Sequence, residues 1–192
     1  MNTKDIILKN ALKVFSQKGY LGATTKEISR EAGFAEVTLF RYFTSKEKLF
    51  EEVINTYSFL PALKGLLPKI TKMTFENALT LIAENFLDTL TARKDLIRIM
   101  LSEIQIYPEK IHKIYNAFIV ELHKTLASYF TAMQKKGVLR SYDAELGARV
   151  FLGMFFSYFN AKEFLMLKKY RATDDNKVIK EFVRIFVRGT LK

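Results

Sequence analysis

The sequence contains no cysteine among its 192 residues. Without thiols the chain can form neither a disulfide nor a thiolate zinc site, and it has no cysteine nucleophile; this composition fits a reducing compartment. Proline and glycine are also scarce, at three and eight residues. Because these two residues interrupt regular structure, their scarcity favours long helices over many short strands.

Long apolar runs are missing as well. The longest stretch without a charged residue, 150–161, has twelve residues, whereas a membrane-spanning helix needs about 20. Lys4, Asp5 and Lys9 interrupt the N-terminal apolar residues, which is unlike a secretory signal peptide. We therefore expect a soluble, cytoplasmic protein that does not enter a membrane.

Motifs for catalysis are the third absence. The sequence has no glycine-rich phosphate loop, no nucleophile elbow and no metalloprotease motif. Its two histidines, His112 and His123, are eleven residues apart on one predicted helix, roughly 16 Å along the helix axis. They cannot share a metal within one chain. The sequence therefore predicts no enzymatic activity, no metal and no cofactor.

Apolar and basic residues are abundant. Hydrophobic residues make up 49% of the chain and aromatic residues 14%, enough for a sizeable packed core. The net charge is +11, which indicates an anionic partner such as nucleic acid, a membrane surface or an acidic ligand. Residues 1–48 carry nine Lys/Arg and five Asp/Glu, so the basic excess is spread along the chain and does not choose among these partners.

Apolar periodicity and capping residues predict an all-α chain of about nine helices. The expected helices cover 4–18, about 24–32, 36–43, 45–60, 74–92, 94–105, 108–136, 141–170 and 173 onward, with a loop over 61–68.

The first fifty residues contain a helix-turn-helix pattern. Thr24 and Glu27 have the spacing of a capping box at a helix start. Gly33 supplies the tight turn that follows, and a short helix over 36–43 comes next. A second helix held in this way is free to enter a DNA major groove. We therefore divide the chain into a helix-turn-helix DNA-binding domain, 1–48, and a ligand-binding and dimerisation domain, 49–192.

Residues 24–49 read TTKEISREAGFAEVTLFRYFTSKEKL, and this stretch resembles the DNA-binding motif of the TetR (tetracycline repressor) family in nearly every element. The preceding Ala11, Phe15, Gly19 and Tyr20 also fit the family pattern, so about forty residues match in register. The segment 137–140 resembles the family more weakly, and the rest of the body is similar only in helix layout.

The resemblance implies a ligand-responsive transcriptional regulator, with repression as its usual effect. It implies a homodimer in which each head places its third helix in a major groove of a palindromic double-stranded DNA operator. The last two helices of both subunits would form a four-helix bundle. A small ligand bound in the body would change the spacing of the two heads.

The candidate DNA contacts are Thr25, Lys26, Ala35, Glu36, Val37, Thr38, Arg41, Tyr42 and Lys46. Thr25 and Lys26 begin a helix, where free amides favour phosphate, although capping and solvation are the alternative. Thr38 and Tyr42 share one helix face, and Arg41 has the fork that binds guanine. The resemblance places Lys46 at a phosphate-contacting position.

Two residues depart from the family pattern. Phe40 stands where a tyrosine is usual, so a hydroxyl contact to phosphate is excluded there. Glu36 stands where polar or basic residues are common, and it could accept a hydrogen bond from cytosine or only favour the helix dipole. Ala35 cannot cap the third helix with its side chain, which should cost about 1 kcal/mol.

The segment 150–159 is apolar on all sides, so it needs cover on more than one face. We expect a pocket on one face and a partner subunit on the other. Candidate interface residues are Val150, Met154, Tyr158, Val178, Phe182, Ile185 and Phe186. Candidate pocket residues are Asn85, Phe86, Met100, Tyr107, His112, Tyr115, Phe118, Phe155, Phe159 and Asn160. Such a lining predicts a small hydrophobic or aromatic effector, but each of these residues could instead belong to the core.

Three other interpretations remain from the residues alone. The basic charge and amphipathic helices would also suit peripheral membrane binding. A protein that compacts nucleic acid would bind every duplex equally, whereas a regulator must discriminate. A helical ligand-binding protein without a DNA function would leave the pattern over 24–49 unexplained.

Overall fold

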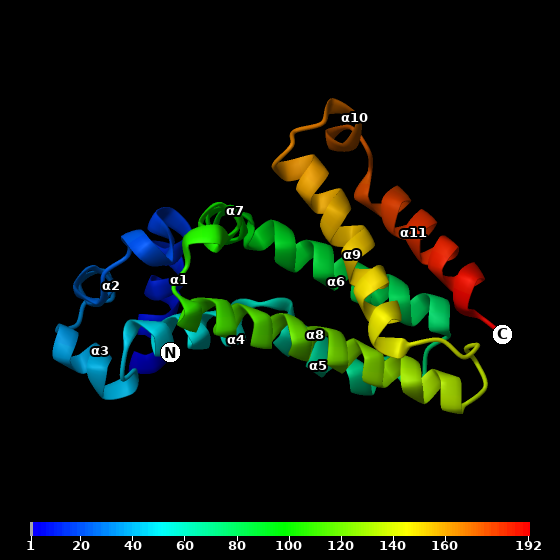
Figure 1. Ribbon diagram of the computed structural model, residues 1–192, viewed down its shortest axis with the longest axis horizontal. Helices are drawn as coiled ribbons and strands as arrows, with labels where there is room; N and C mark the ends of the chain where they lie inside the picture. Colours follow the sequence, from blue (N-terminus) through cyan, green and yellow to red (C-terminus); the bar gives the residue numbers. More distant parts are fainter. Residues whose placement is uncertain (1) are drawn as a thin grey trace. The chain divides into compact units, whose positions relative to one another are not determined.

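A computed structural model describes residues 2–192, except for the side chain of Arg171. Within that range every regular element is a helix, which confirms the all-α prediction (Figure 1). The elements are α1 (Thr3–Gly22), α2 (Thr25–Glu31), α3 (Glu36–Tyr42), α4 (Lys46–Tyr57), α5 (Phe59–Ile70), α6 (Phe75–Ala92), α7 (Lys94–Glu103), the 3-10 turn η1 (Ile104–Ile106), α8 (Glu109–Lys135), α9 (Ala144–Glu163), α10 (Lys168–Arg171) and α11 (Asp175–Thr190).

The nine expected helices are all present, and several start at the predicted caps. The side chain of Thr24 accepts a hydrogen bond from the Glu27 amide at 3.1 Å, at the start of α2. Ser45 caps α4 in the same way, from the amide three residues on. Asp143 accepts two backbone amides at the start of α9. These local bonds satisfy donors that have no partner inside the helix, which explains why the boundaries fall there.

The loop expected over 61–68 is wrong, because α5 occupies this segment. Pro61 is the third residue of the helix, where a backbone amide would have no intrahelical acceptor in any case. Pro68 lies only two residues before the helix ends. The apolar side chains of α5 are buried on one face, and this packing outweighs the two prolines; the buried residues are Phe59, Leu60, Leu63, Leu66 and Ile70.

The helix expected over 141–170 also ends early, at Glu163. The backbone amides of residues 164–165 both donate to the carbonyl of Asn160, at 3.0 and 3.1 Å. Met166 then adopts a left-handed conformation with φ of 51°. A helix cannot continue through such a residue, so the chain turns and forms the separate short helix α10.

The chain forms two compact units. The first unit contains the residues up to Ser58 together with Arg93–Phe118, and the second contains Phe59–Ala92 together with Ile119–Lys192. The first is packed around Phe15 and Phe50, whose ring centroids lie 5.1 Å apart. The second is packed around a cluster of aromatic rings, among them Phe130, Phe151 and Phe186.

None of the helices within residues 2–192 is long and apolar enough to cross a bilayer.

Candidate nucleic-acid interface

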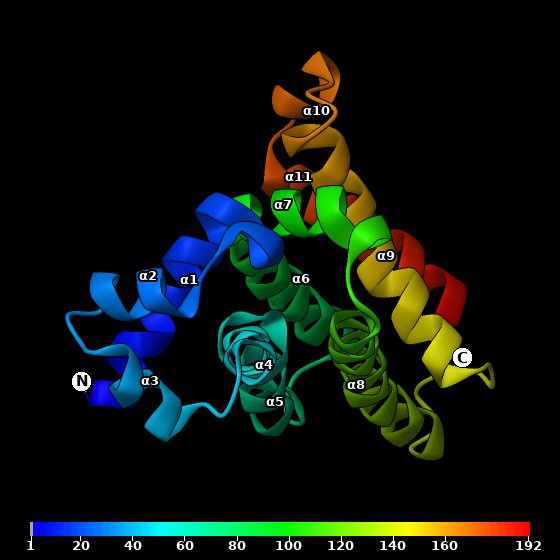
Figure 2. The same cartoon turned by 60° about the vertical axis from the view of Figure 1, so that its left-hand side comes forward.

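Helices α2 and α3 are joined by a tight turn at Gly33 and lie beside α1 (Figure 2). Gly33 has φ of 77°, the left-handed conformation that glycine adopts without strain. The Phe34 amide donates to the Ser29 carbonyl at 2.9 Å, which closes the turn. Ile28 on α2 and Leu39 on α3 are both fully buried. The two helices are thus fixed to the core of the first unit, as a helix-turn-helix requires.

Leu39 is the buried residue of helix α3, and four of its other six residues are exposed. Val37 is 69% exposed, and Phe40 and Tyr42 are exposed as well. Arg41 is exposed, and Thr38 is half-buried. A seven-residue helix with three exposed large apolar side chains is unusual for a plain surface, because such side chains ordinarily seek a core. The arrangement suits contact with base edges and methyl groups.

Thr25 and Glu36 are bonded to each other. The Thr25 hydroxyl donates to the Glu36 carboxylate at 2.6 Å, linking the first turn of α2 to the first turn of α3. A hydroxyl has one hydrogen to donate, so Thr25 cannot give that hydrogen to a phosphate while this bond holds. The sequence offered no signal for the pair, because the residues are eleven apart and meet only through the fold.

Lys46 begins α4 directly after the Ser45 cap. Its ammonium lies 4.3 Å from the centroid of the Tyr20 ring, close enough for a cation–π interaction. Burial lowers the pKa of Lys46, while the negative charges of Glu47 and Glu103 act in the opposite direction. The predicted phosphate-contacting lysine is therefore held in a defined place against an aromatic ring.

Helix α2 carries the predicted DNA contact Lys26 and a second basic residue, Arg30, which the sequence analysis missed. Lys26 and Arg30 are four apart on the helix and both exposed. They line a shallow groove of about 620 Å³ together with Lys18, whose ammonium is bonded to Glu27 at 2.6 Å. The four-residue spacing could have identified Arg30, because it shares the helix face of Lys26.

The candidate pocket residues fall into both compact units. Met100, Tyr107, His112, Tyr115 and Phe118 belong to the first unit, and Asn85, Phe86, Phe155, Phe159 and Asn160 belong to the second. The buried members are Phe86, Met100, Tyr107, Phe155 and Phe159. The side-chain amide of Asn85 donates to the Leu81 carbonyl at 2.8 Å, within its own helix.

The candidate interface residues lie on α9 and α11 of the second unit. Val150 and Ile185 are 55% and 59% exposed, whereas Tyr158, Val178 and Phe186 are buried within the chain. Met154 and Phe182 are half-buried. Leu146, 58% exposed, was missed; it lies one helical turn before Val150.

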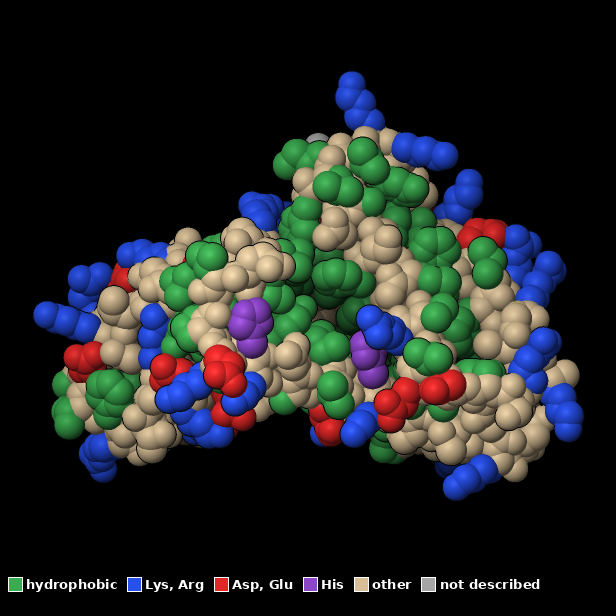
Figure 3. Space-filling view, viewed as in Figure 1, with side chains coloured by type: hydrophobic (Ala, Val, Ile, Leu, Met, Phe, Trp, Pro, Cys, Tyr) green, Lys and Arg blue, Asp and Glu red, His purple; other side chains and the backbone are tan. Residues whose placement is uncertain are grey.

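These exposed side chains line an apolar groove of about 470 Å³ between α9 and α11. Figure 3 shows hydrophobic side chains gathered over the α9 region of the second unit. In the part of the chain that the structure describes, no three His, Cys, Asp or Glu side chains are grouped so that they could hold a metal ion.

Comparison with known proteins identifies the same two parts of the chain. Residues 7–53 match the family model of bacterial regulatory proteins of the tetR family. Residues 77–189 match the model of the C-terminal domain of AefR-like transcriptional repressors.

Individual relatives agree with these family models. The uncharacterised HTH-type transcriptional regulator YvkB of Bacillus subtilis is 28% identical over 187 residues, covering 97% of this chain and 96% of YvkB. The HTH-type transcriptional repressor NicS of Pseudomonas putida is 46% identical over 53 residues, which are 28% of this chain and 25% of NicS.

Solved structures share the fold over the whole chain. A TetR-family regulator from Mesorhizobium loti superposes with a TM-score of 0.80 at 21% identity, covering 99% of this chain and 97% of that one. The flavonoid-responsive regulator FrrA gives a TM-score of 0.69 at 24% identity, with coverage of 98% and 97%. Regulators of this family are DNA-binding transcription factors without enzymatic activity, and they act as dimers. Because a single family model covers more than half of the 192 residues, the chain belongs to the TetR family of transcriptional regulators and is a DNA-binding protein of the repressor type.

Proposed function

We propose that this regulator represses transcription in the cytoplasm as a homodimer on a palindromic operator, and that a small apolar or aromatic effector releases it. Residues 1–48 are the DNA-binding head, and residues 49–192 bind the effector and the partner subunit. The observation that carries the proposal is the exposed surface of α3, on which Val37, Phe40, Arg41 and Tyr42 are all open to solvent.

Each exposed group of the head has a chemical counterpart on DNA. The guanidinium of Arg41 forks onto the two acceptors of guanine, and the side chain of Val37 packs on a thymine methyl group. Lys26 and Lys46 neutralise phosphates, and the hydroxyls of Thr38 and Tyr42 donate hydrogen bonds to phosphate oxygens. These contacts set the register of the head without reading sequence. Ala35 lets the backbone approach the base edges closely.

The apolar groove between α9 and α11 supports dimerisation. Leu146, Val150 and Ile185 are each more than half exposed in a single chain. An exposed apolar patch of this kind is costly in water unless a partner covers it. A second copy that presents the same two helices is self-complementary across a twofold axis, and it would complete a four-helix bundle.

The aromatic side chains of the second unit support an apolar or aromatic effector. Among the candidate pocket residues, Phe86 packs against Phe59 with ring centroids 5.0 Å apart. Pockets lined by such rings bind flat, apolar ligands with few polar groups. The structural relative FrrA is a flavonoid-responsive regulator, and a flat aromatic compound of that chemical class is the first effector to test. A coupling of about 1–3 kcal/mol between effector and operator would be typical, and it must be reciprocal.

The test is selection of bound sequences from a random duplex library with the full chain. We expect a palindromic winner that binds at least about 10³-fold more tightly than scrambled DNA at physiological salt. Enrichment of no sequence, with salt-sensitive binding to every duplex, would mean that charge alone governs binding and would refute the site-specific regulator. Arg41→Ala should abolish the enrichment, whereas Lys169→Ala, an exposed cation on α10, is the matched control and should retain it.

The operator found in this way then tests the release. Titration of the bound operator with flavonoid-type aromatic compounds should release it at saturating ligand. Operator that stays bound in the presence of every compound that binds the protein would refute the ligand response and leave the DNA specificity intact.

A further inference from the structure

Glu103, the last residue of α7, is bonded to the end of α1. Its Oε2 accepts a hydrogen bond from the backbone amide of Tyr20 at 3.0 Å, although the two residues are 83 positions apart. The preceding residue, Gly19, has φ of 71° and kinks α1. The Glu103 carboxylate fills the space that a side chain at position 19 would need. A glycine, a kink and a carboxylate from another helix therefore form one fitted contact.

Tyr20 contacts both Glu103 and Lys46, the proposed phosphate-binding lysine. Tyr20 is 6% exposed, and its ring packs edge-on against Phe50, with centroids 5.1 Å apart, and against Tyr107 at 6.2 Å. The ammonium of Lys46 lies over the same ring, 4.3 Å from its centroid. The backbone of Tyr20 is thus held by Glu103, while its ring holds Lys46. All of these residues belong to the first compact unit.

A lysine side chain has many rotamers, and ordering it against a phosphate costs conformational entropy. The Tyr20 ring already restricts where the Lys46 ammonium can lie. The place open to the Lys46 ammonium depends on where the Tyr20 ring lies. The ring in turn follows the backbone at the Gly19–Tyr20 kink, to which Glu103 is bonded.

We propose that Glu103 is a positioning residue for DNA binding: it fixes the Gly19–Tyr20 kink and thereby the aromatic face that orients Lys46 toward an operator phosphate. The inference rests on the proposed phosphate contact of Lys46. Glu103 is the last residue of α7 and directly precedes η1. A shift of the end of α7 would therefore move the Glu103 carboxylate and change operator affinity.

A double-mutant cycle tests the inference. Operator affinity of the full chain is measured by fluorescence anisotropy for the wild type, K46A, E103A and the double variant, over a series of salt concentrations. We expect each single variant to bind about tenfold more weakly and the double variant to lose little more, because both changes remove one contact. The salt dependence of log affinity should fall by about 0.9 in each variant, the value for one lost phosphate contact.

Three controls separate positioning from folding. E103Q keeps an oxygen that can accept from the Tyr20 amide and should recover most of the lost affinity. E109A alters an exposed glutamate at the start of α8 and should bind as the wild type does. E103M preserves the length of the side chain without an acceptor, and it replaces E103A in the cycle if thermal unfolding shows that E103A does not fold.

The outcomes distinguish the inference from the proposed function. If K46A changes neither affinity nor salt dependence, the phosphate contact of Lys46 is wrong and the inference falls with it. If K46A weakens binding while E103A and E103M bind as the wild type does, or weaken binding additively without a change in salt dependence, only the positioning role of Glu103 is overturned.

Discussion

The Thr25 hydroxyl donates to the Glu36 carboxylate at 2.6 Å and thereby ties the start of the recognition helix α3 to the start of α2. Both residues were expected to contact DNA individually. Their bond links the first turns of α2 and α3, a structural role for Glu36 that neither cytosine binding nor the helix dipole had suggested. It also places a negative charge beside the DNA contacts proposed for α3.

Glu36→Gln should therefore have two effects of different sign. Removing the negative charge should raise affinity for random duplexes several-fold at low salt, because repulsion of phosphates is lost. Weakening a hydrogen bond to a charged acceptor should lower the free energy of unfolding by about 1 kcal/mol. Anisotropy titration and urea denaturation measure the two effects. An unchanged affinity for random DNA would show that Glu36 lies away from the phosphates.

Val37 should set the preference for one base pair. Its side chain is 69% exposed, so Val37→Ser costs little folding stability. Loss of a contact to a thymine methyl group should weaken binding to the best operator by about 1–3 kcal/mol. Repeating the duplex selection with this variant should show a relaxed preference at one position of each half-site. A selected sequence identical to that of the wild type would exclude Val37 from base reading.

Local signals carried most of the fold prediction. The caps at Thr24 and Ser45 and the glycine turn at Gly33 act within a few residues, so the sequence alone placed the helix-turn-helix correctly. The loop predicted around Pro61 and Pro68 was wrong because the effect of a proline depends on its position in the helix. In α5, Pro61 falls in the first turn, where it costs little. Pro68 removes one intrahelical hydrogen bond, and the buried apolar face of the helix outweighs that loss.

Hydrogen bonds between helices in the first unit could not be predicted from local signals. Glu103 and Tyr20 are 83 residues apart, and Thr25 and Glu36 approach only after α2 and α3 pack. Periodicity describes which face of a helix is apolar and does not say which polar side chain from another helix will reach it. Leu146 was not predicted because it lies one turn before the apolar run at 150–159, next to the charged Glu145 and away from the segment that indicated an interface.

Dimerisation should depend on the groove between α9 and α11. Val150→Glu places a charge among exposed apolar side chains and should convert the dimer to a monomer, because an unpaired charge is costly in an interface. Analytical ultracentrifugation measures the change, and operator affinity should fall with it. Val120→Glu is the matched control, since this valine is also half exposed, on α8. If the Val150 variant remains a dimer, the partner binds another face.

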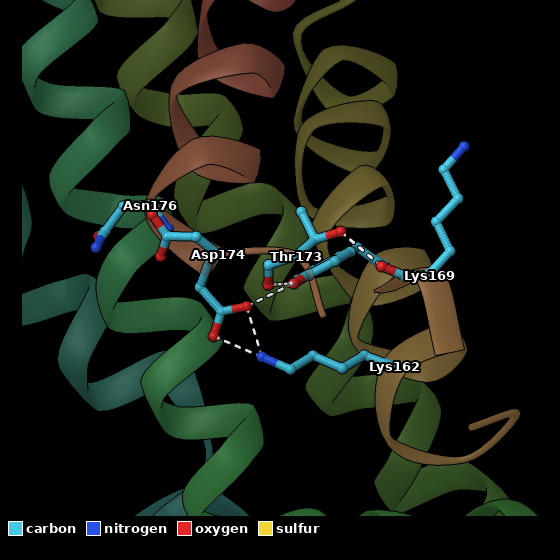
Figure 4. Close-up of polar contacts among 7 residues, drawn as sticks. Lys162, Lys169, Thr173, Asp174 and Asn176 are labelled. Carbon is cyan, nitrogen blue, oxygen red and sulfur yellow. Dashed lines mark hydrogen bonds and ion pairs between the residues drawn. The ribbon is translucent and has the colours of Figure 1, made fainter. Parts of the chain in front are cut away.

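Asp175 should stabilise the junction of α9 and α11. Its Oδ1 accepts from the Tyr158 hydroxyl at 2.5 Å and from the Lys162 ammonium at 2.6 Å, and Figure 4 shows Lys162 reaching toward the first turn of α11. Asp175→Asn removes the charge and one acceptor, which should lower the free energy of unfolding by about 1–3 kcal/mol. Glu181→Gln, in an exposed pair within α11, should change it by less than about 0.5 kcal/mol. Equal effects would mean that the junction bond is no stronger than a surface pair.

Tyr129 should make folding stability depend on alkaline pH. Burial raises the pKa of its hydroxyl from 10.0 to about 12, because the charged form is disfavoured away from water. Because the pKa is higher in the folded state than in the unfolded state, the protonated hydroxyl favours folding relative to the ionised form. This contribution to the free energy of unfolding is fully present below pH 10 and is lost as the pH rises through about 12. Tyr129→Phe removes this titration.

Within the described residues the Tyr129 hydroxyl is buried without a hydrogen-bond partner, so the phenylalanine variant should also be about 1 kcal/mol more stable at pH 7. Urea denaturation at pH 7 to 12 measures both effects. The wild type should lose stability relative to the variant above pH 10, and parallel curves would show that the hydroxyl is solvated in the folded chain.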